Sequence, residues 1–247
     1  RAAFLRAIAE NPDDDLPRLV YADWLDEHGE PERAEFIRVQ CELARLPRDE
    51  ARFAKLQRRE EELLTKYETE WRPGSFDGLT FGPFERGFVR ALAATQFEAF
   101  LAHIWDIKPL RPIHELRIGR MRTSQLRRLA QVRLLSAFTL LDVSNGTIGN
   151  DAIPAFVRSP HLHNLRLLNL AWHRIGDVGA QALAEATTLA GLQSLELQGN
   201  RIGDTGAEAL AASPHLASLS RLDLRGNPIG REGRAILRAR FGTAVKL

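Results

Sequence analysis

The C-terminal half of the chain repeats one pattern of aliphatic and polar positions. Segments that start at Leu165, Leu192 and Leu219 align without a gap and at equal spacing. Segments that start at Phe138 and, one slightly shorter period further upstream, at Ile113 fit the same frame less closely. The frame reads L-x-x-L-x-L-x-x-N-x-I-G-D-x-G-A-x-x-L-A. A fixed period of this length is typical of repeat architectures, in which each unit buries its apolar side against the next.

Each part of the frame predicts a local structure. The alternation Leu195-Glu196-Leu197 predicts a short strand with one face inward and one outward. Asn200 is expected to hydrogen-bond to turn backbone where the strand ends. Gly203-Asp204 has the composition of a turn and helix N-cap, and the helix is expected to run from Ala207. The period therefore predicts an α/β solenoid of short parallel strands and helices.

The N-terminal part of the chain, from Arg1 to Arg72, has helical spacing instead. An apolar stripe that includes Phe4 and Ile8 is ended by Asn11-Pro12. Pro17 opens a second helix that Gly29 closes, since proline suits a first turn and glycine a C-terminus. A third helix runs from Pro31 to Pro47, and a fourth, highly charged one follows from Asp49 to Glu70.

The chain is therefore expected to have four parts. Residues 1–47 form a small all-α N-terminal module, and residues 48–72 form a charged connecting helix. Residues 73–112 are expected to close the first end of the solenoid, with a strand or hairpin at Phe81–Val89 and a helix at Thr95–Trp105. Residues 113–247 hold about five repeats and a C-terminal cap.

Two stretches resemble known families. The repeat frame resembles the ribonuclease-inhibitor class of leucine-rich repeats, which implies a right-handed solenoid with strands on the concave side and helices on the convex side. The stretch Pro17–Gly29, followed by Arg33–Leu43, resembles the bacterial repeat-companion domain over roughly residues 3–46. The first resemblance implies a scaffold that binds proteins, and the second implies a bacterial source but supplies no reaction or ligand.

Composition adds limits to this picture. Hydrophobic residues make up 44% of the chain and charged residues 27%, as in ordinary globular proteins. The single cysteine, Cys41, excludes an internal disulfide framework and fits a reducing compartment. No run of 18 apolar residues exists, so no membrane span is expected. We therefore expect a cytoplasmic protein, and the question whether a targeting segment precedes Arg1 stays open.

The outward strand positions are the leading candidate site. We predict that another protein, of unknown identity, binds the concave face, where Trp172 is the central anchor because a Trp among glycines and polar residues is typical of interfaces. The simpler alternative is that Trp172 folds over the strand edge and packs locally. The other predicted contact residues are Asn169, Glu196, Gln198, Asp223, Arg225, Asp142 and Arg117.

A basic cluster from Lys108 to Arg133, mainly between Arg111 and Arg133, gives a second hypothesis. It suggests nucleic-acid or polyphosphate binding, chiefly through Arg117, Arg120 and Arg122, because arginine binds phosphate oxygens in a bidentate manner. No aromatic residues interleave with these arginines, so nucleic acid is the less favoured partner. A solvated face explains the same charges. The cluster also contains Lys108, Arg127, Arg128 and Arg133.

No catalytic, metal or cofactor site is expected. Cys41 lies between Val39 and Leu43 on an apolar helix face, which favours a buried thiol over a nucleophile. The acidic residues at positions 13–15 lack the spacing of a calcium loop and are expected to cap a helix. The histidines show no metal-ligand spacing. Partner identity and oligomeric state do not follow from the sequence.

Overall fold

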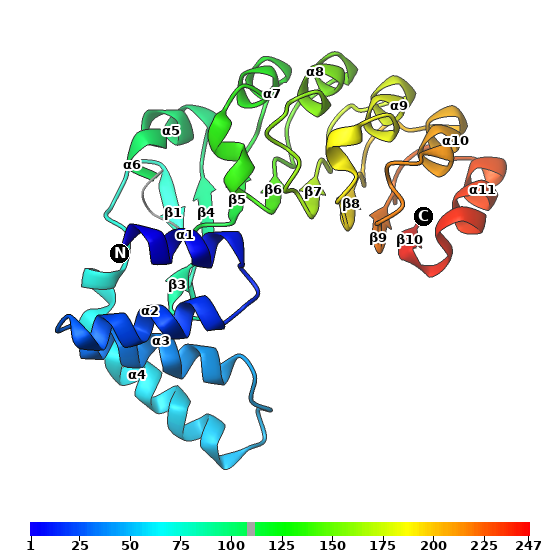
Figure 1. Cartoon of the computed structure of the whole chain (residues 1–247). Coiled ribbons are helices and arrows are strands. Elements are labelled where there is room, and N and C mark those ends of the chain that lie inside the picture. The colour runs from blue at the N-terminus through cyan, green and yellow to red at the C-terminus, as the bar shows by residue number, and fades with distance from the viewer. Residues whose placement is uncertain (108–111) are drawn as a thin grey trace. The chain divides into compact units, whose positions relative to one another are not determined.

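The computed structural model describes residues 1–107 and 112–247, shown in Figure 1. Its internal contacts divide the chain into two compact units. The helical unit comprises Arg1–Leu92 and Trp105–His114, and the repeat unit comprises Ala93–Ile104 and Glu115–Leu247. Residues 73–112, which we expected to form one cap of the solenoid, are thus divided between the two units. The four domain boundaries themselves stay a prediction.

The helical unit contains the four helices that the sequence predicted, followed by short strands. Strands β2 and β3 form an antiparallel hairpin in which Phe84 pairs with Val89, and β1 lies beside β4. The helices are α1 (Ala2–Glu10), α2 (Leu16–Glu27), α3 (Pro31–Leu43) and α4 (Ala51–Trp71). The strands are β1 (Leu79–Phe81), β2 (Phe84–Glu85), β3 (Phe88–Val89) and β4 (Ala91–Ala94), the last of which continues into the repeat unit.

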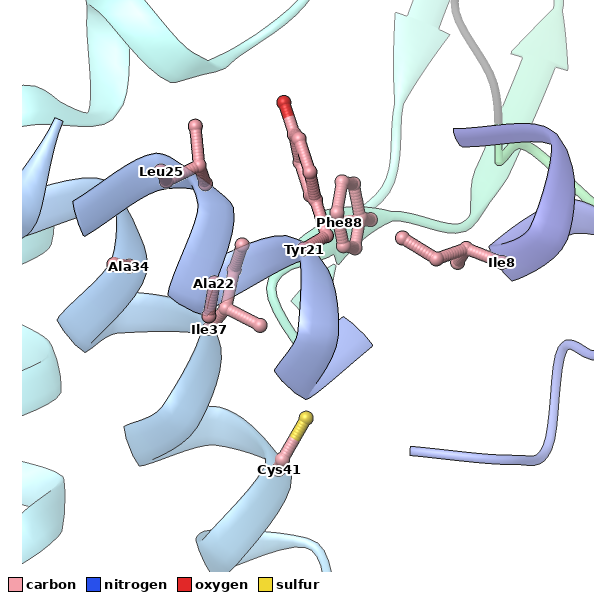
Figure 2. Packing of buried hydrophobic residues seen from close by; sticks show 8 residues of the cluster. All are labelled: Ile8, Tyr21, Ala22, Leu25, Ala34, Ile37, Cys41 and Phe88. Carbon is pink, nitrogen blue, oxygen red and sulfur yellow. The ribbon is translucent and has the colours of Figure 1, made fainter. Parts of the chain in front are cut away.

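The hairpin supplies part of the core of this unit. Figure 2 shows Phe88 beside Tyr21, with Ile37 in the same cluster, and Phe84 packs edge-on against Phe36 in a neighbouring cluster. Gly87, at the turn, has a φ of 89°, and a Cβ there would lie 2.6 Å from Cγ1 of Ile37. Only glycine fits that close approach. The helices are therefore as predicted, but they share their core with a β-hairpin.

The repeat unit is built on a row of strands in the order β4 to β10, and the strands from β5 to β10 pair in parallel. Figure 1 shows helices α7 to α11 as one row, with the strands on the inner side of the curve. The strands are β5 (Glu115–Ile118), β6 (Leu140–Asp142), β7 (Leu167–Asn169), β8 (Ser194–Glu196), β9 (Arg221–Asp223) and β10 (Val245–Lys246). The helices are α5 (Phe97–Ala102), α6 (Ile104–Ile107), which crosses the division between the units, α7 (Thr123–Leu129), α8 (Ile153–Val157), α9 (Asp177–Ala184), α10 (Asp204–Ala212) and α11 (Arg231–Phe241). Single 3₁₀ turns lie at Arg133–Ala137, Asn150–Ala152, Thr187–Leu189 and Gly242–Ala244.

Strand register confirms the alignment of the repeats. The inward leucine of each strand pairs with the corresponding leucine of the next, and all of them are fully buried. This spine consists of Leu116, Leu141, Leu168, Leu195 and Leu222. A single strand of this kind would leave its leucine exposed, so the stack is what removes these side chains from water.

The three most regular repeats also share a buried polar ladder, which is a series of side chains, one in each unit, that hydrogen-bond to the backbone of the preceding unit. Asn200 Oδ1 accepts a hydrogen bond from the backbone of Ile175 (3.1 Å), and its Nδ2 donates to the carbonyl of Leu170 in the preceding repeat (2.9 Å). Asn227 repeats this arrangement one unit later. His173 takes the same place in the preceding unit, because its Nδ1 accepts from Ile148 N (3.2 Å) and its Nε2 lies 2.7 Å from Val143 O. The shared geometry of the repeats therefore tolerates an imidazole in place of an amide.

The helix N-termini form a second ladder, which corrects one prediction. We expected Asp204 to cap its own helix, but the N-cap of α10 is Gly203. Oδ1 of Asp204 instead accepts from Gly230 N and Gly233 N, at the start of the following helix (2.8 and 3.2 Å). Asp177 does the same for α10, and Asn150 for α9. Each of these helices is capped by the repeat before it, because the repeats stack closely enough for that side chain to reach across.

Candidate functional site

The outer strand face carries four rows of side chains, one residue from each repeat per row. Pairing of the strands places Arg117, Asp142, Asn169, Glu196 and Asp223 in one central row, as the sequence predicted. The row before it contains Leu140 and Leu167, which pair with each other and are half-buried. We did not predict this aliphatic pair. Its signal was a leucine at a variable position of the frame, directly before the inward leucine, in two consecutive repeats.

Two polar side chains of the central row accept hydrogen bonds from the backbone two residues further along. Oδ1 of Asp142 accepts from Ser144 N, and Oδ1 of Asn169 accepts from Ala171 N, each at 2.9 Å. These bonds close the turn in which each strand ends, as side chains of Asp and Asn commonly do. Asp142 and Asn169 are therefore rigidly placed on the face, which lowers the entropy that a partner must overcome on binding.

Two ion pairs lie along the same face. Arg117 Nη2 contacts Glu115 Oε2 at 2.8 Å, and Arg221 Nη2 contacts Glu196 Oε1 at 3.2 Å. Each pair joins residues on the strand surface, so the charges of Arg117 and Glu196 are largely balanced where they stand. The central part of the face is left with the aliphatic pair, the amide of Asn169 and the carboxylate of Asp142.

Asp223 is not part of the exposed surface, and this corrects its predicted role. Its side chain has 0% exposure beneath Arg225, whose Nε and Nη2 donate to both carboxylate oxygens (3.0 and 2.7 Å). Burial opposes the charged form, but the hydrogen bonds and charge of Arg225 lower the pKa of Asp223 below its ordinary value. Arg225 stays exposed, and Asp223 serves to hold it.

Trp172 lies in the fourth row, at a backbone position that favours glycine. All members of this row have positive φ: Arg120 (51°), Asn145 (61°), Trp172 (61°), Gly199 (68°) and Gly226 (70°). A bulky residue in this left-handed region costs about 1 to 2 kcal/mol relative to glycine. The indole lies on Gly199, where a Cβ would be only 2.3 Å from Cε3 of Trp172.

Trp172 packs locally and is also exposed, so its position agrees in part with each interpretation, the interface anchor and the locally packed side chain. One face of the ring packs against Gly199, while 56% of the residue remains exposed. Gly199 lets the ring lie flat, because any side chain at that position would displace it. The ring is thus held in place and still presents a large apolar surface to solvent.

The basic cluster does not form one free patch. Lys108 and Arg111 lie outside the described residues. Arg117 is paired with Glu115, Arg127 Nη2 donates to Asp151 O (3.0 Å), and the guanidinium of Arg128 lies 5.2 Å from the centre of the Phe97 ring.

Arg120 and Arg122 line a hollow of about 460 Å³ in the repeat unit. Glu98 lines it too, and its carboxylate accepts from Gln125 (2.9 Å), a bond that lowers the pKa of Glu98 and keeps it negative. A carboxylate beside two guanidinium groups reduces the attraction of this hollow for phosphate.

The other residues considered for catalysis or metal binding have structural roles. Cys41 is buried, and burial raises the pKa of its thiol to about 12, so it stays a thiol at neutral pH. Asp14 Oδ1 accepts from Leu16 N at the start of α2 (2.9 Å), whereas the N-cap residue Asp15 is buried and its carboxylate pairs with Arg45 (2.6 Å) and Arg86 (3.2 Å) instead of capping the helix. In the described part of the chain, no group of three or more histidine, cysteine or acidic side chains is arranged to hold a metal ion.

No helix within residues 1–107 and 112–247 combines the length and the apolar content that crossing a bilayer requires.

Comparison with known proteins identifies leucine-rich repeats in this chain. A family model described as leucine rich repeat matches residues 161–184, 192–211 and 215–235, which overlap the three most regular repeats. No curated protein matches the chain. Among solved structures, an internalin from Listeria monocytogenes is 28% identical, with a TM-score of 0.38, and the match covers 51% of this chain and 32% of the internalin chain. The chain thus spans about a third of the length of that internalin.

Proposed function

We propose that this chain, which carries leucine-rich repeats, is a non-enzymatic scaffold that binds another protein on the outer strand face of its repeat unit. The partner would bury Trp172 in an apolar recess of its own surface and also contact Leu140 and Leu167, which lie in the first row of the face. Asn169 and Gln198, whose positions in the chain lie between those of Leu167 and Trp172 or their equivalents in the next repeat, would supply hydrogen bonds between these apolar contacts. An aromatic anchor surrounded by fixed polar groups is the composition of an interface hot spot.

The observation that carries this proposal is the strained and exposed position of Trp172. The next two repeats have glycine there, which satisfies the same backbone without strain. Tryptophan costs stability at this position and leaves apolar area in water. A role in binding explains why such a residue stands where folding alone favours glycine.

Trp172→Gly tests the proposal because it separates binding from stability. The substitution restores the residue of the following repeats, so the free energy of unfolding should stay unchanged or rise by up to about 1 kcal/mol. Affinity for the partner, once captured from the native cell, should fall by about 2 kcal/mol, or roughly thirtyfold. Urea unfolding and isothermal titration calorimetry measure the two effects.

Asn145→Gly is the matched control. Asn145 lies in the same row, one repeat earlier, with the same φ of 61°. The control makes the same backbone change and leaves the indole in place, so its affinity for the partner should equal that of the wild type. If Trp172→Gly binds as tightly as Asn145→Gly, Trp172 is not part of the interface.

The hypothesis of nucleic-acid or polyphosphate binding gains little support from the arginine contacts. Arg117 has an acidic neighbour, and Glu98 lines the hollow beside Arg120 and Arg122. A gel shift at low salt distinguishes the two proposals. Binding through phosphates would give a complex that dissociates steeply as salt rises.

We also propose that residues 3–46 form a repeat-companion module of a bacterial, cytoplasmic protein. The helices α1 to α3 support this assignment, as does a free and buried Cys41, which suits a reducing compartment. Recovery of the chain in the cytoplasmic fraction of its native cell would test the location.

A further inference from the structure

A pocket in the helical unit is lined by aromatic and charged residues that have no part in the proposed scaffold role. It has a volume of about 590 Å³, which is within the range of small-molecule sites. Its walls come from α2, α3, the end of α4 and the hairpin β2–β3. The aromatic lining residues are Tyr21, Trp71, Phe84 and Phe88. Figure 2 shows two of them, Tyr21 and Phe88, side by side, and their ring centres are 6.1 Å apart.

Arg33, on α3, is the polar group at the centre of these aromatic residues. Its guanidinium carbon lies 5.0 Å from the centre of the Trp71 ring, 5.3 Å from that of Phe88 and 5.6 Å from that of Phe84. The residue is only 9% exposed. Burial lowers the pKa of Arg33 to about 10, so the group is still positively charged at neutral pH.

The hydrogen-bonding capacity of Arg33 is only partly used. Nη2 donates to the carbonyl of Gly87 and so holds the hairpin turn (2.5 Å). Nη1 is buried, and no described residue accepts a hydrogen bond from it. No carboxylate of the described residues forms an ion pair with Arg33. A buried charged donor without an acceptor is costly, and such groups normally have a partner.

The other arginines of the pocket are already paired. Arg1 forms two hydrogen bonds with Glu30 (3.0 and 3.2 Å). Arg72 donates to Glu68 and to the carbonyls of Phe81 and Gly82. Glu70 also lines the pocket but is exposed to solvent, so the buried charge that lacks an acceptor is that of Arg33, and a ligand with one negative charge would balance it.

We propose that this pocket binds a small organic oxyanion, whose carboxylate or phosphate oxygen accepts a hydrogen bond from Arg33 Nη1 and whose apolar body, aromatic by preference, lies among Tyr21, Trp71 and Phe88. The oxyanion supplies the missing acceptor in a site of low polarity, where a charge-assisted hydrogen bond is strong. The aromatic walls supply the apolar contact area. This binding activity is independent of the protein-binding face.

Calorimetric titration of the full chain with three model compounds tests the charge requirement. Phenylacetate and phenyl phosphate carry the oxyanion on an aromatic ring, and phenylacetamide has the same ring without the charge. At least one of the two anions should bind about ten- to a hundredfold more tightly than the amide. The tighter anion identifies the carboxylate or phosphate class. If the amide binds as well as both anions, the proposal is wrong.

Two variants locate the site. Arg33→Met keeps the side-chain length and fits the aromatic walls, and it should weaken binding of the preferred anion about ten- to a hundredfold. Arg38→Met is the matched control on the same helix, because Arg38 pairs with Asp23 and Asp26 and does not line the pocket. It should bind the anion as the wild type does. Equal binding by folded Arg33→Met and the control would overturn the proposal.

Gly74→Trp keeps the test decisive if Arg33→Met fails to fold. Gly74 lines the pocket, and a Cβ there would meet only the Phe76 ring, at 3.9 Å, so a large side chain is accommodated. The indole should occlude the pocket and abolish anion binding while the far-ultraviolet circular dichroism and melting temperature stay those of the wild type. Undiminished binding by this variant would place the anion elsewhere and reject the site.

Discussion

At the residue scale, two adjacent side chains depart from the repeat frame in different ways. Trp172 replaces a glycine and adds strain and exposed apolar area on the surface. His173 replaces an asparagine in the buried ladder and satisfies the same kind of backbone groups. Trp172 therefore indicates a role other than folding, whereas His173 keeps the structural role of the asparagine that it replaces. Gly146, which lacks a side chain at this position, leaves room for the imidazole, since a Cβ there would lie 2.8 Å from Cε1 of His173.

His173 should make stability depend on pH. Burial lowers the pKa of His173 below its ordinary 6.5, because a buried site disfavours the charged ring, and only the neutral ring accepts from Ile148 N. The folded state thus binds its proton less tightly than the unfolded state. The contribution of His173 is fully present above pH 6.5 and is lost as pH falls below that value. Urea unfolding at pH 7.5 and 5.5 should show the loss.

His173→Asn provides the comparison for this prediction. Asparagine has no titration near neutral pH and restores the residue of the next two repeats. The variant should lose less stability between pH 7.5 and 5.5 than the wild type does. An equal loss in both proteins would assign the pH dependence to other groups.

At the element scale, each regular helix depends on its neighbour for its N-terminal cap. Asp177→Ala should therefore weaken α10, where Gly203 N and Gly206 N lose their acceptor, more than α9, in which Asp177 lies. The expected cost is about 1 kcal/mol. Hydrogen exchange should become faster at Gly206 in this variant. Thr205→Ala, an exposed change in the first turn of α10, is the control and should leave that rate unchanged.

The helices also approach each other closely because the second glycine of the repeat frame, Gly206 in α10, has no side chain. A Cβ on Gly206 would lie 2.6 Å from Oδ1 of Asp177 and 2.8 Å from Cγ2 of Ile202. Gly206→Ala should therefore destabilise the fold by about 1 to 3 kcal/mol, although alanine favours helices. Gly191→Ala is the control, since its nearest atom would be 3.9 Å away. Thermal unfolding should separate the two variants, and equal melting temperatures would contradict this account.

At the scale of the whole molecule, the two compact units should respond separately to damage. Leu195→Ala in a central repeat removes a fully buried side chain of the spine, at a cost of about 2 to 5 kcal/mol. Hydrogen exchange should rise in the neighbouring repeats, because each repeat is stabilised by the next. Amides of α3 in the helical unit should keep their rates. A rise in both units would show that they unfold together.

Several structural features followed from sequence pattern because they depend on local periodicity. The inward leucines, the strand register and the central row were predicted from the alignment of the repeats, since a strand exposes alternate side chains on opposite faces. Proline and glycine positions predicted the ends of the first helices. The aliphatic pair Leu140 and Leu167 was also readable, but it lay at a position that we treated as variable.

The sequence by itself determined the repeat, its spine, the four N-terminal helices and the candidate anchor Trp172. Only the tertiary structure decided that Asp223 is buried under Arg225, that Asp204 caps the following helix, and that Arg33 lies in an aromatic pocket with an unpaired donor. The reason is physical. Periodicity reports which face of one element is apolar, whereas hydrogen bonds and burial depend on which atoms from distant elements come within about 3 Å.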